Sequence, residues 1–336
     1  MNPKPPIVTR LLAMVALFMV STGISSDIHA QGQAQAPASR IDANPVGIVS
    51  TPARNLLMKS SQALRNSKPL QAKSRMRVQM FDQQVVAHGN YWQAGQGTGS
   101  ARWEYTVPVS GSTAATSIKP DSADLFLLQV CHRGFYYRLQ TGGEEPKLDY
   151  ADLRQLSKAD DDFLFARQGA WMATGGVSGL LELLATNFKF ADAQRIKVGS
   201  NDVWKMSGGW NEERLRRLLN GQVVHGLIRD EIKWLKLPKQ VPHSCEILIA
   251  ADDYFPGFPY RLTFFQKRDL DGVVQNKPMV SIEFYELQTD VNLDEAMFDV
   301  NFDGIKPEDM TDSFVQRIEA LQRARRSARQ KRALSR

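Results

Sequence analysis

Two histidines each lie close to a cysteine, and these four residues are the first candidates for chemistry. His132 follows Cys131 directly, and His243 precedes Cys245 by two positions. Residues two apart on a strand share a face, so His243 and Cys245 are placed to ligate one metal ion or to act as base and nucleophile. Cys131 and His132 point to opposite faces of a strand, so only one of them can join His243 and Cys245. These residues therefore cannot supply four ligands to one metal ion. We therefore expect no metal site.

Carboxylates gather in two places, at Asp160 to Asp162 and at Asp252 and Asp253. Both groups fall between predicted elements, where solvated loops are expected. The chain contains no G-x-S-x-G, no H-E-x-x-H, no phosphate-binding loop and no C-x-x-C motif. Because no nucleophile and base can be named, the sequence predicts a protein that is not an enzyme. An envelope hydrolase built on Asp253, His243 or Cys245 stays as the third alternative.

Cys131 and Cys245 lie 114 positions apart. In an exported protein, a disulfide can persist between them, and closing so long a loop stabilises a fold by about 4 to 5 kcal/mol in the chain-entropy model. Two buried free thiols are the alternative, because cysteine is also a common core residue. The sequence leaves both alternatives open.

Composition places the chain among ordinary globular proteins. Its 336 residues are 43% hydrophobic, 23% charged and 9% aromatic, which argues against a disordered, collagen-like or multi-span membrane protein. The net charge of +6 is concentrated at the C-terminus, where residues 316–336 carry eight Lys or Arg against one Glu. Residues 31–315 have a net charge of −2. The body of the protein is therefore not basic, and no nucleic-acid partner is expected.

The N-terminus has the pattern of a secretory signal peptide. Lys4 and Arg10 precede ten apolar residues, Leu11 to Val20, a run too short to span a bilayer. We expect residues 1–30 to be a cleaved signal peptide, with an uncleaved anchor as the alternative. Residues 31–52, rich in Gln, Ala, Pro and Ser, are expected to be a linker. The protein is therefore expected to be exported.

Hydrophobic periodicity predicts one domain at 53–313, mainly β with inserted helices (α+β). An alternation of period two predicts about ten strands, at 75–80, 84–92, 101–107, 124–131, 135–139, 195–198, 202–208, 244–250, 260–267 and 279–289. Helical spacing predicts helices at 53–64, 148–156, 176–188 and 211–219. Strands that follow one another without regular βαβ units indicate one large curved antiparallel sheet. Residues 314–336 are expected to form a basic tail, helical and then disordered, which either contacts an anionic membrane surface or is simply solvated.

Aromatic and leucine side chains recur on the predicted strands and on the helix at 176–188. In a small closed barrel such residues fill the core. In a wider or incompletely closed barrel, the same inward face lines a cavity for an apolar ligand, and an inserted helix can serve as its lid.

The order of these elements resembles a known family, the LolA-like periplasmic outer-membrane lipoprotein carriers and lipoprotein-sorting proteins. The resemblance covers residues 55–313. Five segments carry it: RMRVQMFDQQVVAHGNYWQAGQGTGSARWEY, LQVCHRGFYYRL, LDYADL, GGVSGLLELL and IEFYELQTDVNLDEAMFDVNFDGIKPED. It implies an unclosed β-barrel of about ten to eleven strands with a helical lid, located in the periplasm.

The resemblance also implies a function, which is to bind the acyl chains of a lipoprotein or another lipid without a cofactor. We expect the protein to be non-catalytic and a monomer. The residues expected to line the lipid cavity are Trp103, Tyr105, Leu180, Leu184, Phe188 and Phe264. The alternative is an envelope sensor or scaffold with the same fold, in which the barrel is filled by its own side chains and a protein partner binds elsewhere.

Overall fold

The computed structural model describes residues 45–80, 83–108, 125–142, 145–156, 175–218, 241–251, 255, 257–270, 273–300 and 304–312. The expected signal peptide, both acidic clusters and the basic tail lie outside these residues. Within them, no helix combines the length and the hydropathy needed to cross a bilayer.

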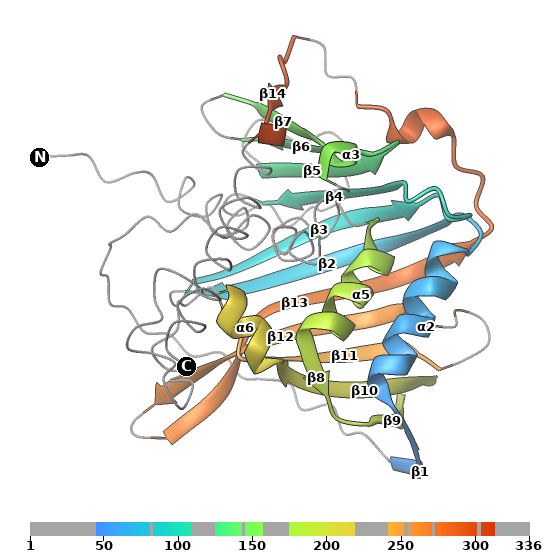
Figure 1. Ribbon diagram of the computed structural model, residues 1–336, viewed down its shortest axis with the longest axis vertical. Helices are drawn as coiled ribbons and strands as arrows, with labels where there is room; N and C mark the ends of the chain where they lie inside the picture. The colour runs from blue at the N-terminus through green and yellow to red at the C-terminus, as the bar shows by residue number, and fades with distance from the viewer. Residues whose placement is uncertain are drawn as a thin grey trace, which may run out of the picture.

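One sheet of 14 strands forms the body of the protein (Figure 1). Its order in space is β1 (Pro45–Thr51), β9 (Ala193–Val198), β10 (Asn201–Trp210), β11 (Ser244–Ala250), β12 (Pro259–Leu270), β13 (Val273–Thr289), β2 (Leu70–Met80), β3 (Gln83–Gln93), β4 (Ala101–Val107), β5 (Leu125–His132), β6 (Phe135–Thr141), β7 (Lys147–Asp152) and β14 (Glu308–Asp309). The short β8 (Phe188–Phe190) pairs with β10. All pairs are antiparallel except β7 with β14.

The sheet is not closed, because β1 and β14 end it on opposite sides and do not pair with each other. This confirms the expected mainly β fold with an unclosed barrel. The ten predicted strands are all present, and β13 pairs with β2 to join the C-terminal strands to the N-terminal ones. The structure adds β1, β7, β8 and β14 to the expected number.

Two sequence-based expectations about elements are wrong. Residues 45–51, expected in the linker, form β1 and pair with β9. Residues 148–156 were expected in a helix, but 148–152 belong to β7 and only Leu153–Leu156 is helical (α3). The leucines of this segment have helical spacing, but Leu148 and Asp149 are buried on opposite faces of a strand paired with β6.

Two helices lie side by side on one face of the sheet, α2 (Ala53–Arg65) and α5 (Val177–Asn187) (Figure 1). We call the sheet face that they cover the inner face and the opposite one the outer face. Helix α2 buries one stripe that includes Leu57 and Leu64. Helix α5 is buried along almost its whole length, because its leucines contact both the sheet and α2. A third helix, α6 (Glu212–Leu218), follows β10.

The described residues of the C-terminal segment, 291–300 and 304–312, cover the outer face of β4 to β7. Phe298 of the 3-10 helix η4 (Glu295–Phe298) belongs to a second core with Leu128, Val130, Leu139 and Leu148. The guanidinium of Arg102 donates a hydrogen bond of 2.7 Å to the carbonyl of Met297. The segment continues into β14 beside β7, where Glu308 and Asp309 pair with Asp149 and Tyr150.

Gly176 sets the position of α5, and its replacement tests that role. It precedes the helix with φ 71° and ψ −142°, a combination essentially confined to glycine. A Cβ there would lie 2.8 Å from the Cβ of Ala101 and closer still to the Tyr91 hydroxyl. We expect Gly176→Ala to lower the free energy of unfolding by about 3 kcal/mol in chemical denaturation.

Gly199→Ala is the control, because Gly199 also has a positive φ but nothing within 4 Å of an added Cβ. It should cost about 1 kcal/mol. Equal losses for the two variants would contradict the proposed contact at Gly176.

Candidate functional site

The six residues expected to line a cavity lie together in one core on the inner face. Their exposure runs from 0% for Trp103 to 9% for Phe264. Leu180 and Leu184 come from α5, and the aromatic residues come from β4, β8 and β12. The structure therefore gathers the predicted set between the helices and the sheet, with every member buried.

The aromatic members form two groups. In the first, the rings of Trp103 and Tyr105 have centroids 4.5 Å apart, and Trp103 stacks on Phe284 at 5.7 Å. Tyr91 meets both Trp103 and Phe284 edge-on, at 6.1 Å and 5.7 Å. Edge-to-face and offset-stacked pairs of this kind stabilise a core beyond the area they bury. This aromatic group packs on the inner face of β3, β4 and β13.

The second aromatic group lies at the C-terminal end of α5. Phe188 stacks on Trp210 with centroids 4.5 Å apart and lies 6.4 Å from the ring of Phe264. The indole nitrogen of Trp210 donates a 2.6 Å hydrogen bond to the carbonyl of Pro242. Sequence reasoning missed Tyr91, Phe284 and Trp210 as site residues. The alternation of Val85, Ala87 and Tyr91 along β3 is the signal that would have found the first.

The Tyr91 hydroxyl ties both helices to the sheet. It accepts a 2.9 Å hydrogen bond from the N–H of Val177, the first residue of α5, and donates one of 2.6 Å to Gln93. The Gln93 amide in turn donates a 2.7 Å bond to the carbonyl of Leu64, in the last turn of α2. Burial raises the pKa of Tyr91, so the phenol stays protonated and can donate. We call these three bonds the Tyr91 relay.

One exposed contact joins the helices directly. The guanidinium of Arg65 in α2 lies 2.7 Å from the carboxylate of Glu182 in α5. Both side chains are well exposed, so the pair contributes little to stability. Glu182 is one of the two residues of α5 that are not buried.

The cysteines are free thiols and lie far apart in the sheet. Cys131 is on β5 and Cys245 on β11, both buried on the inner face. Six strand positions separate them, about 29 Å measured along the sheet, whereas the Cα atoms of a disulfide lie about 4.4 to 6.8 Å apart. The structure therefore has two buried cysteines with no disulfide between them. Burial raises the pKa of the Cys245 thiol, which disfavours the nucleophilic thiolate.

No cluster of three His, Cys, Asp or Glu side chains in the described ranges has the geometry of a metal site. His132 and Cys131 point to opposite faces, as the strand alternation predicts, because His132 stacks on Phe298 of the outer core. His243 precedes β11, where burial and then the charge of Lys267 lower its pKa to about 4.

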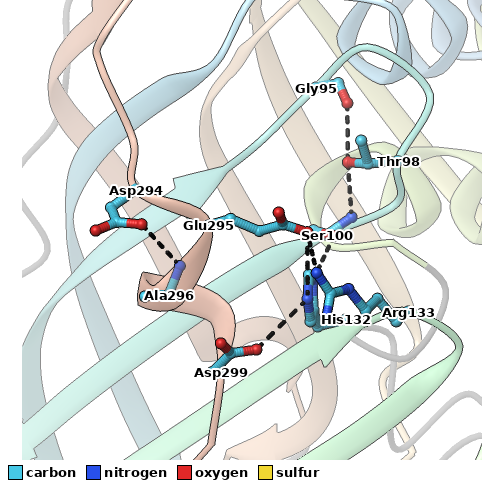
Figure 2. Close-up of polar contacts among 9 residues, drawn as sticks. All are labelled: Gly95, Thr98, Ser100, His132, Arg133, Asp294, Glu295, Ala296 and Asp299. Carbon is cyan, nitrogen blue, oxygen red and sulfur yellow. Dashed lines mark hydrogen bonds and ion pairs between the residues drawn. The ribbon is translucent and has the colours of Figure 1, made fainter.

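A different constellation surrounds His132 (Figure 2). Its Nδ1 shares a 2.9 Å hydrogen bond with the hydroxyl of Ser100, and its Nε2 lies 3.7 Å from Asp299 and 3.9 Å from Glu295. Serine, histidine and carboxylate are the residue types of a nucleophilic triad. Ser100 did not figure among the sequence candidates, because it lies far from His132 along the chain.

The setting of His132 indicates a structural tie. Ser100 is buried, and its N–H is bonded to Thr98 in the glycine-rich turn between β3 and β4. Arg133 donates to Glu295 at 2.5 Å, which joins the β5–β6 turn to η4. The constellation therefore fastens the C-terminal segment to the sheet, on the face opposite the apolar core. We assign it no catalytic role.

No protein-family model matches this chain, and no curated protein sequence matches it. Among solved structures, a putative outer membrane lipoprotein-sorting protein domain from Vibrio parahaemolyticus is 8% identical over 73% of this chain and 95% of its own, with a TM-score of 0.33. A LolA superfamily protein from Nitrosomonas europaea is 8% identical over 74% of this chain and 98% of its own, with a TM-score of 0.27.

The MucA/MucB complex of Pseudomonas aeruginosa is 12% identical over 75% of this chain and 62% of the matched chain, with a TM-score of 0.37. The three matched structures all have TM-scores below 0.5. At such identities and TM-scores they carry over no ligand, partner or activity.

Removing the Tyr91 hydroxyl tests the relay. We expect Tyr91→Phe to lower the free energy of unfolding by about 1 to 3 kcal/mol, because the buried N–H of Val177 and the Gln93 amide lose their partner. Hydrogen exchange at the start of α5 should become faster. Tyr285→Phe, at an exposed tyrosine, should stay within about 0.5 kcal/mol of the parent. Unchanged exchange at Val177 in Tyr91→Phe would show that the relay does not hold α5.

The histidines make stability depend on pH. Burial is the first cause that lowers the pKa of His88, His132 and His243 below the ordinary 6.5. The unfolded chain therefore takes up protons before the folded one, and stability present above about pH 6.5 is lost as pH falls toward 4. Asp152 has a pKa of about 2, held low by Arg154, so its contribution is lost only at lower pH.

We therefore expect a lower free energy of unfolding at pH 5 than at pH 7.5, measured by chemical denaturation. His243→Gln should reduce the difference between the two values, because it removes the group with the lowest histidine pKa. Equal stability at both pH values would contradict this account.

Proposed function

We propose that this chain is an exported, non-catalytic carrier that holds the acyl chains of a lipoprotein or another lipid between its helices and the inner face of its sheet. It acts in the periplasm, as a monomer and without a cofactor. The single observation that supports this proposal is an apolar inner face covered by two helices, with a short polar relay at one end of the pair.

The packing of α5 determines how much free energy is needed to lift this helix from the sheet. Leu180, Leu181, Leu183 and Leu184 are all buried, and each fully buried leucine contributes about 1.5 to 3 kcal/mol. Lifting this helix from the sheet without a ligand would therefore cost about 6 to 12 kcal/mol. An acyl chain that enters beneath the helix offers new apolar contacts to the same leucines and to Trp103, and so offsets that cost. Opening is favourable only when an apolar ligand replaces the lost contacts.

The remaining residues of the predicted set fit an elongated ligand. Trp103 packs against Tyr91, whose hydroxyl bonds the start of α5, and Tyr105 packs against Trp103, whereas Phe188 follows the end of α5. Phe264 packs beside Phe188. A chain lying along α5 would contact both groups in turn. The basic tail at 314–336 supplies positive charge suited to an anionic membrane surface, where such a carrier would load or unload.

An envelope sensor or scaffold is the second candidate. The observation that favours it is that all six predicted cavity residues are buried against neighbouring side chains, as in a filled barrel. Such a protein would bind a protein partner and no lipid.

Native mass spectrometry of the protein purified from an exporting host separates the two candidates. The carrier should show a discrete adduct of lipid mass that organic extraction releases. Leu184→Asn places an amide in the inner core and should abolish the adduct. The matched control is Leu128→Asn, which places the same amide in the outer core and should retain it.

Both substitutions bury an unpaired amide, so both should destabilise by about 2 to 5 kcal/mol, and circular dichroism establishes that each variant is folded. A protein mass without adduct, together with no uptake of added fatty acid or phospholipid, would sink the carrier and favour the scaffold. Loss of the adduct in both variants would show that it does not bind beneath α5.

A further inference from the structure

The two helices over the inner face are fastened to the sheet in different ways. We call α2 and α5 together the lid. The first residue of α5, Val177, donates its N–H to Tyr91, and the last, Asn187, continues directly into β8, which pairs with β10. The carbonyl of Asn187 also accepts a 2.8 Å hydrogen bond from the N–H of Asn211. Helix α5 is therefore held at both of its ends.

Helix α2 is held by polar contacts at its C-terminal end. The carbonyl of Leu64 accepts a hydrogen bond from the amide of Gln93, and the carbonyl of Arg65 accepts one of 2.8 Å from the N–H of Gly97, in the turn between β3 and β4. Among the described residues, no hydrogen bond or ion pair joins residues 53–61 to another element. The N-terminal two thirds of α2 therefore depend on apolar contacts alone.

Those apolar contacts are few. Helix α2 buries two leucines, Leu57 and Leu64, together with Ala53 and two serines, whereas α5 buries four leucines. Within residues 53–61, Leu57 is the one fully buried leucine, and Leu56 is half-buried. The helix begins after Pro52, which supplies no side-chain hydrogen bond to the free N–H groups of the first turn, and this turn has no acidic residue. The start of α2 is thus the most weakly held part of the lid.

The strand before α2 adds little restraint. β1 is at the edge of the sheet and pairs only with β9, in an irregular register. Helix α2 contacts β8, which follows the end of α5, so the start of α2 lies near β8 and its end lies near Tyr91 (Figure 1). Movement of the start of α2 would therefore uncover Phe188 of β8 and leave the Tyr91 relay in place.

We infer that α2 is the moving part of the lid. It pivots about Leu64 and Arg65 while α5 stays on the sheet, and an acyl chain enters beneath residues 53–61. This inference rests on the proposed carrier function and specifies how the ligand reaches its site. The number of buried leucines decides between the helices, because the pivot of α2 separates one fully buried leucine from the core, whereas lifting α5 separates four.

Hydrogen exchange of the full, ligand-free protein tests which helix opens. We expect the amides of 57–61 in α2 to exchange at least about tenfold faster than those of 181–185 in α5. Pro52→Ser supplies a capping hydroxyl at the start of α2. It should slow both the exchange of 57–61 and the uptake of a fluorescent fatty acid by about fivefold, with the exchange of α5 unchanged. Pro278→Ser, at an exposed proline of β13, is the matched control and should change neither rate.

Spin labels locate the movement when a ligand binds. Cys131 and Cys245 are buried, so labels attach to introduced cysteines, one of them at the exposed Tyr285 of β13 as a fixed reference. Asn55 and Asn66 are both exposed, and Asn55 lies about 14 Å from the pivot along the helix axis. On addition of oleate, double electron–electron resonance should show a shift of several Å for Asn55→Cys. For Asn66→Cys, next to the pivot, the distance should stay constant.

The other outcomes separate this inference from the carrier proposal. Exchange of 57–61 as slow as that of 181–185, or equal shifts at Asn55→Cys and Asn66→Cys, would overturn the pivot and leave the carrier standing. A shift at Thr186→Cys in α5 with none at Asn55→Cys would do the same, by making α5 the moving helix. No uptake of fatty acid by the parent protein would overturn the carrier proposal, and the entry route with it.

Discussion

The hydroxyl of Tyr91 is the contact on which the arrangement of helices over the sheet depends. Tyr91 lies on β3, and its hydroxyl accepts a hydrogen bond from the N–H of Val177, the first residue of α5. The same hydroxyl donates to Gln93, which donates to a carbonyl in the last turn of α2. The leucine contacts hold the helices against the sheet but specify their position weakly, because hydrophobic attraction has no direction. The hydrogen bonds of one buried phenol supply the direction. Gly176 makes this possible, since any side chain there would occupy the place of the hydroxyl.

Period-two alternation was enough to predict ten strands and one large antiparallel sheet, since residues such as Met76 and Val78 bury one face of a paired strand. The open barrel was implied only by the family resemblance. It failed where local patterns were ambiguous. The leucines at 148–156 have helical spacing, yet pairing with β6 makes most of that segment a strand. Strands β8 and β14 are three and two residues long, too short to show any period. Their partners are distant in the chain, so only the folded sheet identifies them.

The candidate site was predictable in part for the same reason. The residue types of Trp103, Leu184 and Phe264 predict an apolar interior, and all three are buried in the same core. The hydrogen-bonding role of Tyr91 gave no such signal. It depends on the N–H of Val177, 86 positions further along the chain, and on Gln93, which donates to the carbonyl of Leu64. Contacts between such distant residues cannot be derived from the pattern of any single segment.

The pairing of β13 with β2 also determines when the protein can acquire its fold. Val280 lies beside Val78, so a central pair of the sheet joins residues about 200 positions apart. Contacts of such long sequence separation slow folding, because the entropy of closing the intervening chain must be lost before they form. Strands β2 to β7 have no partner on the β2 side until almost the entire chain has been synthesised. The protein therefore assembles late and cooperatively, and its N-terminal half alone would expose an unpaired strand edge prone to aggregation.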